Sequence, residues 1–353
     1  MVTDPSRSWL VLTDGYLETR NAKTAHGVLR YARDRIAAVL DRDHAGRSLA
    51  EVMPEMRRDA PIVGSFEEGA ALGATSLLLG VATPGGWIPE HWRAWMLEAA
   101  ASGMEIANGL HRFLRDDAEL VGVANEHGAR LWDVREPPEG IPLCSGKALE
   151  APQRIVLTVG SDCAVGKMTA SLELAAAAEA AGRRAEFVAT GQTGILIAGK
   201  GIAVDRVISD FVSGAAEQLV VDADPDAEVL LVEGQGGLWH PAYSGVTLGL
   251  LHGSMPEVLV LVHQAGRTAI EEPPHTVLPP LREMVETYER IGSVVRPCKV
   301  ACVAVNCRGL GQAEARAAVD EVAAATGLPA GDVMAGDAPM LWDAVAAALD
   351  GQG

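Results

Sequence analysis

The sequence predicts an α/β protein with two parallel-sheet domains, and three observations support this fold class. Short apolar runs alternate with helix-length segments throughout the 353 residues, as in parallel sheets covered by helices. The chain is longer than a single hydrophobic core usually requires. In its second half, an apolar run leads into a glycine-bounded loop with a lysine and then into an alanine-rich segment. This order is typical of a phosphate-binding loop followed by a helix.

The first half has the pattern of a small parallel sheet. Strands are expected at 9–13, 36–40 and 77–82, and helices at 28–31, 92–101 and 109–114. Ligands of such sheets bind beyond the carboxyl ends of the strands. Asp14, Asp41 and the turn Pro84-Gly85-Gly86 should therefore line the ligand-binding edge. No G-x-G-x-x-G motif occurs in this half, so the sequence gives no support for dinucleotide binding there.

A proline-rich segment separates the two halves. Glu136-Pro137-Pro138-Glu139-Gly140-Ile141-Pro142 cannot continue a helix or a central strand. We place the boundary near residue 145, which gives domains at 1–145 and 146–353; a surface loop within one domain is the alternative. Strands are expected at 155–159, 185–189, 228–232, 258–262 and 300–305. Helices between several of them predict a doubly wound second domain.

The phosphate-binding loop is the most informative motif of the chain. Its backbone N–H groups and the positive end of the following helix would hold an anionic phosphate, while Lys167 reaches the outer phosphates. The residues expected to bind the nucleotide or cofactor are Gly160, Ser161, Asp162, Cys163, Ala164, Val165, Gly166, Lys167, Met168 and Thr169. The alternative is a glycine-rich turn with a surface lysine.

This loop departs from the usual spacing in two ways. Five residues separate Gly160 from Gly166 instead of the usual four, and Met168 stands where a Ser or Thr normally binds Mg²⁺. Thr169 is one substitute for that ligand; otherwise the metal is bound differently or is absent. The spacing resembles that of dethiobiotin synthetase and its relatives, which are Mg-ATP enzymes that phosphorylate a carboxyl-type oxygen.

Acidic residues in the second half suggest a metal site. Glu233 ends an apolar strand, where P-loop enzymes place a carboxylate that holds Mg²⁺ directly or through water. By the same resemblance, Asp210 matches a second carboxylate ligand, so the expected metal ligands are Thr169, Asp210 and Glu233. Gly236 and Gly237 follow the acid and would let a substrate approach the backbone closely. The alternative is that strand-end acids are solvated turn residues.

Further polar residues cluster after the expected strands. The turn 190–194 is rich in hydroxyl and amide groups that suit a carboxylate or phosphate oxygen, although it could equally be ordinary turn chemistry. The candidate substrate residues are Thr190, Gln192, Thr193, Gly236, Gly237, Tyr243 and Arg267. The candidate catalytic residues are Lys167, His240, His263 and Arg267. Asn306 ends the last strong strand, where related P-loop enzymes use an Asn to recognise adenine.

Composition excludes several classes of protein. The net charge of −18 comes without any basic stripe, which argues against a nucleic-acid partner. No apolar run approaches the roughly 18 residues of a membrane span, and residues 1–8 lack an apolar signal core. We therefore expect a cytoplasmic protein. Separately, we expect a homo-oligomer. The five cysteines lack paired metal spacing, and Cys298, Cys302 and Cys307 fall largely on an expected strand, so structural thiols are favoured over the alternative of a zinc site.

Several of these segments together resemble one family over essentially the whole chain. They include Lys23-Thr24-Ala25-His26-Gly27, the phosphate-binding loop, Ala189-Thr190-Gly191-Gln192-Thr193-Gly194 and Glu233-Gly234-Gln235-Gly236-Gly237. The family is the domain-of-unknown-function family 1611. The resemblance implies an N-terminal Rossmann-like domain and a C-terminal P-loop NTPase-like domain. One branch of the family looks like D-glutamate N-acetyltransferases.

Three functions follow from these features. In the first, which the sequence favours, ATP and Mg²⁺ activate the carboxylate of a small acid or amino acid and an amine attacks the acyl phosphate. Arg267 would hold the acceptor's carboxylate, and His240 or His263 would take the amine proton. In the second, acetyl-CoA is the donor, its phosphorylated ADP portion occupies the loop, and no metal is needed. The third is a nucleotide-gated binding protein without turnover.

Overall fold

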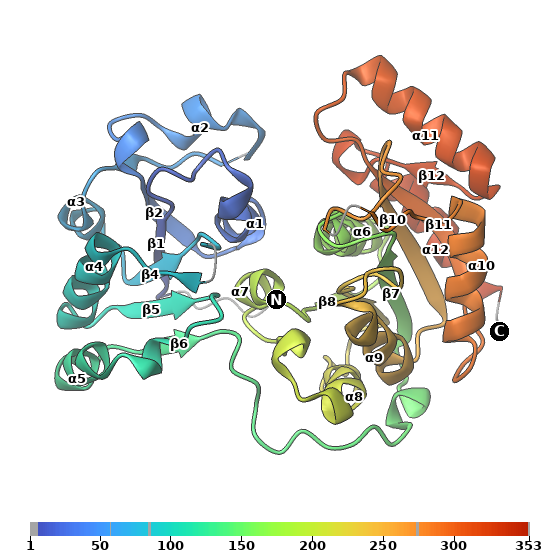
Figure 1. Cartoon of the computed structure of the whole chain (residues 1–353), viewed down its shortest axis with the longest axis horizontal. Coiled ribbons are helices and arrows are strands. Elements are labelled where there is room, and N and C mark those ends of the chain that lie inside the picture. The colour runs from blue at the N-terminus through green and yellow to red at the C-terminus, as the bar shows by residue number, and fades with distance from the viewer. Residues whose placement is uncertain (1–5, 57, 84–85, 273–274, 352–353) are drawn as a thin grey trace. The chain divides into compact units, whose positions relative to one another are not determined.

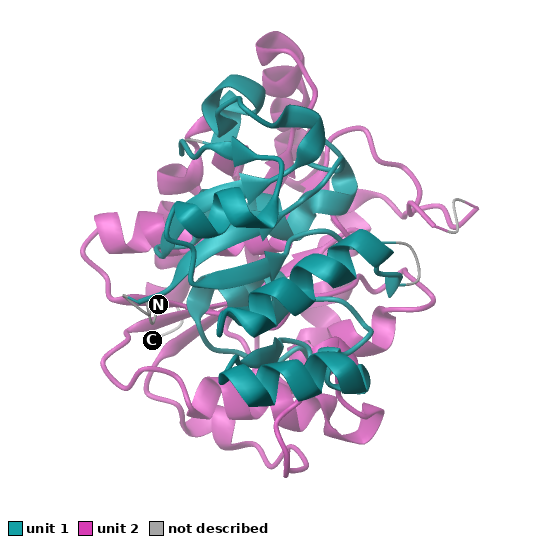
Figure 2. Cartoon of the chain, turned by 90° about the vertical axis from the view of Figure 1, so that its left-hand side faces the viewer, with its two compact units in different colours: residues 1–136, 192–203 teal, residues 137–191, 204–353 magenta. Residues whose placement is uncertain are grey.

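The computed structural model describes residues 6–56, 58–83, 86–272 and 275–351. These residues form two compact units, each built on a parallel sheet with helices on its faces (Figure 1). Unit 1 comprises residues 1–136 and 192–203, and unit 2 comprises residues 137–191 and 204–353 (Figure 2). The α/β fold class predicted from the sequence is confirmed. None of the described helices is both long and apolar enough to span a membrane.

The sheet of unit 1 has the strand order β3-β2-β1-β4-β5-β6 within the described residues. Its strands are β1 (Ser8–Leu12), β2 (Arg35–Leu40), β3 (Ile62–Val63), β4 (Ser76–Leu79), β5 (Glu105–Asn108) and β6 (Leu131–Asp133). Its helices are α1 (Lys23–Tyr31), α2 (Leu49–Val52), α3 (Phe66–Ala71), α4 (Glu90–Ala101), α5 (Ala118–His127) and α7 (Gln192–Ala198). The order reverses beside β1, which pairs with both β2 and β4. Such a reversal is where open α/β sheets bind ligands.

The sheet of unit 2 has the order β12-β11-β10-β7-β9-β8. Its strands are β7 (Arg154–Gly160), β8 (Ala185–Val188), β9 (Val229–Val232), β10 (Val258–Gln264), β11 (Lys299–Asn306) and β12 (Ala330–Gly331). Its helices are α6 (Lys167–Ala180), α8 (Val212–Val221), α9 (Ser244–Ser254), α10 (Leu281–Gly292), α11 (Gln312–Thr326) and α12 (Ala338–Asp350). The central strands are almost wholly apolar and buried, as expected for a sheet covered on both faces.

The expected helix at 109–114 is wrong. Residues 110–112 form bends, and only a short 3₁₀ turn, η5 (Leu114–Asp116), follows. Side chains bind the backbone groups that a helix would use. Asn108 Oδ1 accepts from the Leu110 N–H at 2.9 Å, and Asp133 Oδ1 accepts from the Leu114 N–H at 2.9 Å. Asp133 ends a neighbouring strand, so only the tertiary structure reveals this competition.

Two further predicted turns have different outcomes. Residues 190–194 are only in part a turn, because Gln192 begins α7, which belongs to unit 1. There the Oγ1 atoms of Thr193 and Thr24 lie 3.2 Å apart. In the turn 84–86, Pro84 and Gly85 lie outside the described residues.

The proline-rich segment continues into residues that are fastened to unit 2. Glu217 on α8 is 3% exposed. Its carboxylate accepts hydrogen bonds from the Ser145 N–H at 2.8 Å, the Ser145 hydroxyl at 2.9 Å and the Lys147 N–H at 2.7 Å. Gly214 lies one turn earlier on the same helix, directly under the carbonyl of Pro142. The absence of a side chain at Gly214 lets the segment lie against α8.

We therefore expect Gly214→Ala to destabilise the protein by about 1–3 kcal/mol, the usual cost of overpacking. An added Cβ would lie 1.8 Å from Pro142 O, so the segment would have to move. Chemical denaturation measures the change in the free energy of unfolding. Gly122→Ala on α5 is the matched control, because its Cβ would meet nothing within 4 Å. Equal stability of both variants would contradict the tight contact.

Candidate functional site

The phosphate-binding loop connects β7 to α6 at the reversal of strand order in unit 2. β7 pairs with β10 on one side and β9 on the other. Two positive φ angles shape the loop, +55° at Ala164 and +111° at Gly166. Gly160 leaves room for the lysine, since a Cβ there would lie 2.8 Å from Lys167 Nζ. The loop and the first residue of α6 thus form a compact cradle around one amino group.

Lys167 is buried in this cradle. Its side chain ammonium donates to the carbonyls of Asp162 and Gly236, both at 2.7 Å. Burial lowers the pKa of Lys167 to about 8, although Cys163, Asp162 and Glu233 favour its charged form. The residue is therefore still mostly protonated at neutral pH. Its contact with Gly236 joins the loop to the segment after β9.

Asp162 and Arg267 form a buried ion pair. Asp162 is 0% exposed, and its Oδ2 lies 2.5 Å from Arg267 Nη1. Asp162 also accepts from the backbone N–H groups of Cys163 at 2.6 Å and Glu271 at 2.9 Å. Arg267 Nη2 donates to Gln264 Oε1 at 2.6 Å. The arginine proposed for a substrate carboxylate is thus already paired with an internal one.

Glu233 lies at the tip of β9 and is 5% exposed. Its Oε2 accepts from the N–H groups of Thr190 at 3.0 Å and Gly191 at 3.1 Å. Burial raises the pKa of Glu233 to about 7, and these hydrogen bonds and Lys167 only partly offset the effect. Near neutral pH this carboxyl is therefore only partly ionised. Gly234 follows without a side chain because a Cβ would lie 1.7 Å from Thr158 O.

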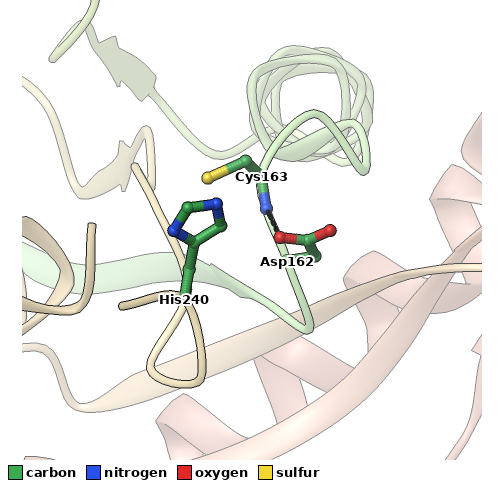
Figure 3. A group of neighbouring side chains, drawn as sticks. All are labelled: Asp162, Cys163 and His240. Atoms are coloured by element: carbon green, nitrogen blue, oxygen red, sulfur yellow. Dashed lines mark hydrogen bonds between the residues drawn. The ribbon is translucent and has the colours of Figure 1, made fainter. Parts of the chain in front are cut away.

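His240 lies beside the crest of the loop. One donor atom each of Asp162, Cys163 and His240 lie within 4.8 Å of one another, with the ring facing the other two (Figure 3). His240 Nδ1 accepts from the Ala242 N–H at 3.2 Å. The proton of the neutral ring is therefore on Nε2. Since Asp162 is also paired with Arg267, this trio is not an open metal site in the observed arrangement.

His263 lies near the end of β10, where its ring contacts Ser161 of the loop. It is 6% exposed, and its Nδ1 lies 3.0 Å from Ser161 Oγ. Burial, with a smaller contribution from Arg267, lowers the pKa of His263 to about 4. The ring is therefore uncharged at neutral pH. It supports Ser161 and is a weak proton acceptor.

Asn306 and Tyr288 complete the support of the loop. Asn306 Nδ2 donates to Val165 O at 3.0 Å, and its Oδ1 accepts from the Arg308 N–H at 3.1 Å. Tyr288 is fully buried and donates to Gly160 O at 2.6 Å, while its hydroxyl accepts from the Leu238 N–H at 3.3 Å. Sequence reasoning missed Tyr288, because it lies mid-helix on α10 without any motif around it.

The remaining predicted site residues are distributed differently. Asp210 is exposed on η8 (Ser209–Phe211), and no hydrogen bond or ion pair joins it to the loop among the described residues. Thr169 lies half-buried in the first turn of α6. Gln192 and Thr193 belong to unit 1, whereas Thr190 and Gly237 belong to unit 2. Tyr243 is 46% exposed and packs against the His240 ring, with centroids 4.5 Å apart. The five cysteines form no disulfide.

Comparison with known proteins places this site in a family. The DUF1611 P-loop domain, a domain of unknown function, matches residues 142–341, and its Rossmann-like N-terminal partner matches residues 42–137. The chain belongs to the DUF1611 family. A crystal structure of a DUF1611 family protein from Anabaena variabilis ATCC 29413 superposes with a TM-score of 0.91 at 40% identity, covering 96% of this chain and 99% of that chain.

Two curated relatives carry a functional name. The chain is 38% identical over 327 residues to a D-glutamate N-acetyltransferase of Tritonibacter scottomollicae, covering 92% of this chain and 94% of the relative. It is 42% identical over 243 residues to a D-glutamate N-acetyltransferase of Pseudoalteromonas sp, covering 69% of this chain and 72% of that relative. The P-loop and Rossmann-like domains expected from the sequence are confirmed by the two domain matches.

The buried state of His263 makes a testable contribution to stability. Its pKa is about 4 in the folded protein, against 6.5 for an ordinary histidine. The folded state thus disfavours protonation, so stability is fully present above pH 6.5 and falls as the pH drops towards 4. The loss reaches about 3 kcal/mol below both values. We expect His263→Gln to flatten this part of the stability–pH profile in denaturant titrations, whereas exposed His275→Gln should leave it unchanged. An equally steep profile in His263→Gln would refute the assignment.

Proposed function

We propose that this protein is an N-acetyltransferase that transfers the acetyl group of acetyl-CoA to the amino group of D-glutamate or a similar amino acid. The observation that carries the proposal is the 38% identity, over 92% of this chain, to a relative named D-glutamate N-acetyltransferase. In the reaction, the amine attacks the thioester carbonyl, a C–N bond forms, the C–S bond breaks, and the amine proton and CoA thiolate leave.

The charges of the loop support a coenzyme diphosphate held without a divalent cation. Asp162 is occupied by Arg267 and two backbone N–H groups, and Glu233 accepts from two others. Met168 replaces the usual hydroxyl ligand. Lys167 and the backbone N–H groups at the start of α6 remain as anion-binding groups. These residues would bind the diphosphate of CoA, which supplies the activated acetyl group.

The second candidate is Mg-ATP-dependent activation of a carboxylate. One observation favours it, which is the position of Glu233 at the end of β9, next to the loop. Strand-end acids hold Mg²⁺ in many P-loop enzymes. In this reading, ionised Glu233 and Thr169 would bind the metal.

A direct assay separates the two. The purified protein is incubated with D-glutamate and either acetyl-CoA plus EDTA or ATP plus Mg²⁺, and CoA, ADP and acetylated amino acid are measured by mass spectrometry. The proposal expects amino-acid-dependent CoA release that EDTA does not reduce. Amino-acid-dependent ADP release without any CoA release would replace it with the second candidate.

Lys167→Ala should weaken acetyl-CoA binding at least tenfold, equivalent to about 1.4 kcal/mol. The variant removes the lysine of the loop, whose ammonium donates its two hydrogen bonds to backbone carbonyls and not to a carboxylate. Calorimetric titration measures the affinity, and the melting temperature reports on folding. Lys299→Ala, at an exposed strand end, is the control. Unchanged affinity in Lys167→Ala would remove the loop from coenzyme binding.

The two candidates predict opposite effects of Glu233→Gln. With a pKa of about 7, Glu233 gains negative charge as the pH rises from 6 to 8, while Lys167, with a pKa of about 8, begins to lose its positive charge. The negative charge on Glu233 repels a diphosphate, and the loss of charge on Lys167 removes an attraction. The affinity for acetyl-CoA should therefore fall over this range. Glu233→Gln should reduce this fall and keep turnover largely intact. Under the Mg-ATP reading, the same variant instead loses ATP affinity and metal dependence together.

A further inference from the structure

A second cluster of polar side chains lies at the carboxyl edge of the unit 1 sheet. Asp14 follows β1, at the reversal of strand order where ligands of such sheets bind. It is 7% exposed and has a φ of +31°. A left-handed backbone is unfavourable for a residue other than glycine and persists only where its surroundings impose it. The side chain contacts of Asp14 provide this constraint.

Four hydrogen bonds converge on the Asp14 carboxylate. Arg42 donates from Nε at 2.7 Å and from Nη2 at 2.9 Å. His91 Nε2 lies at 2.6 Å and Trp92 Nε1 at 2.7 Å. Burial by itself would raise the pKa of Asp14, but the hydrogen bonds from Arg42, Trp92 and His91 outweigh it and lower the pKa to about 2. Asp14 is therefore a permanent anion that fixes an arginine and a histidine side by side.

Each of these two residues keeps a polar atom for a ligand. Arg42 and His91 have side chains that are 52% and 43% exposed. Among the described residues, neither Arg42 Nη1 nor His91 Nδ1 makes a hydrogen bond. Trp95 flanks both, with its ring 5.6 Å from the Arg42 guanidinium and 5.4 Å from the His91 ring. The result is an exposed pair of nitrogens beside an aromatic wall.

The surrounding charges indicate what class of ligand fits. Asp14, Asp43 and Asp41 all act on Arg42 and raise its pKa. Asp41 is buried and engaged by Thr13 and by His44, whereas Asp43 is exposed. A bare phosphate would meet these carboxylates unfavourably. A zwitterion suits the cluster better, because it presents a carboxylate to Arg42 and an ammonium to the acidic surroundings.

We propose that Arg42 and His91, held in place by Asp14, form a binding site for an α-amino acid in unit 1. Arg42 Nη1 donates to the α-carboxylate. His91 donates its Nε2 proton to Asp14, which leaves Nδ1 to accept a hydrogen bond from the α-ammonium. Trp95 packs against the ligand's carbon atoms. The site gives unit 1 a role in amino acid recognition; only the choice of D-glutamate as the first ligand to test rests on the proposed function.

Binding of amino acids to the full chain, without acetyl-CoA, tests the site. Ligand-induced shifts in melting temperature are measured for D-glutamate and for the common L-amino acids, followed by calorimetry of the best ligand. Arg42→Gln and His91→Ala should each weaken binding at least tenfold. Arg42→Lys keeps the charge beside Asp14 if Arg42→Gln folds poorly, and it should also weaken binding because it lacks the second nitrogen. Arg93→Gln, which removes an arginine of α4 paired with Asp117 and Glu119, should change binding less than twofold.

The outcomes separate this site from the proposed function. No amino acid binding, or binding that is equal in all variants, would overturn the site even if acetyl transfer is observed. Equal binding of glutarate or inorganic phosphate would also overturn it, since neither carries an ammonium group. Arg42-dependent binding in a protein that never acetylates its ligand would support the site and refute the acetyltransferase assignment.

Discussion

The buried pair of Asp162 and Arg267 is the interaction on which the phosphate-binding loop depends. A carboxylate with 0% exposure is tolerable only when its charge and its lone pairs are satisfied. Arg267 supplies the charge, and the N–H groups of Cys163 and Glu271 occupy further lone pairs. Because Arg267 and Glu271 follow β10, the pair ties the crest of the loop to the neighbouring strand. Loss of either partner would leave the other uncompensated, which typically costs 3–5 kcal/mol.

This pairing determines which charge is available to a ligand. Arg267 is neutralised internally, and Glu233 is only half-ionised near neutral pH because its pKa is about 7. Lys167 therefore supplies most of the local positive charge, against a net charge of −18 for the chain. The proposed anionic ligand would be drawn by this one buried ammonium and by the loop's N–H groups rather than by the overall field. Because the pKa values of Glu233 and Lys167 are about 7 and about 8, the affinity for the proposed diphosphate ligand should change between pH 6 and 8.

The sequence predicted the strands of unit 2 and the position of the loop because both depend on local patterns. Continuous apolar runs can only be buried strands or helices, and glycine spacing marks the loop. Which side chains pair with one another was not predictable in this way. Arg267 was expected to bind a substrate, but whether its guanidinium meets Asp162 or a ligand depends on how β10 packs beside β7. For the same reason the sequence could not reveal Tyr288, or that Gln192 begins a helix that belongs to unit 1.

Both sheets place a turn at the reversal of strand order, yet the two turns differ in composition. The turn after β7 contains glycines and a lysine, whereas the turn after β1 contains Asp14, an anion with a pKa of about 2. A dinucleotide-binding turn needs glycines there so that the backbone can approach a diphosphate. Here Asp14 places a buried carboxylate paired with Arg42 at that turn, and Asp41, at the end of β2, is engaged by Thr13 and His44. The first turn thus lacks the G-x-G-x-x-G motif of a dinucleotide-binding sheet, and the side chains of Arg42 and His91 lie exposed beside it.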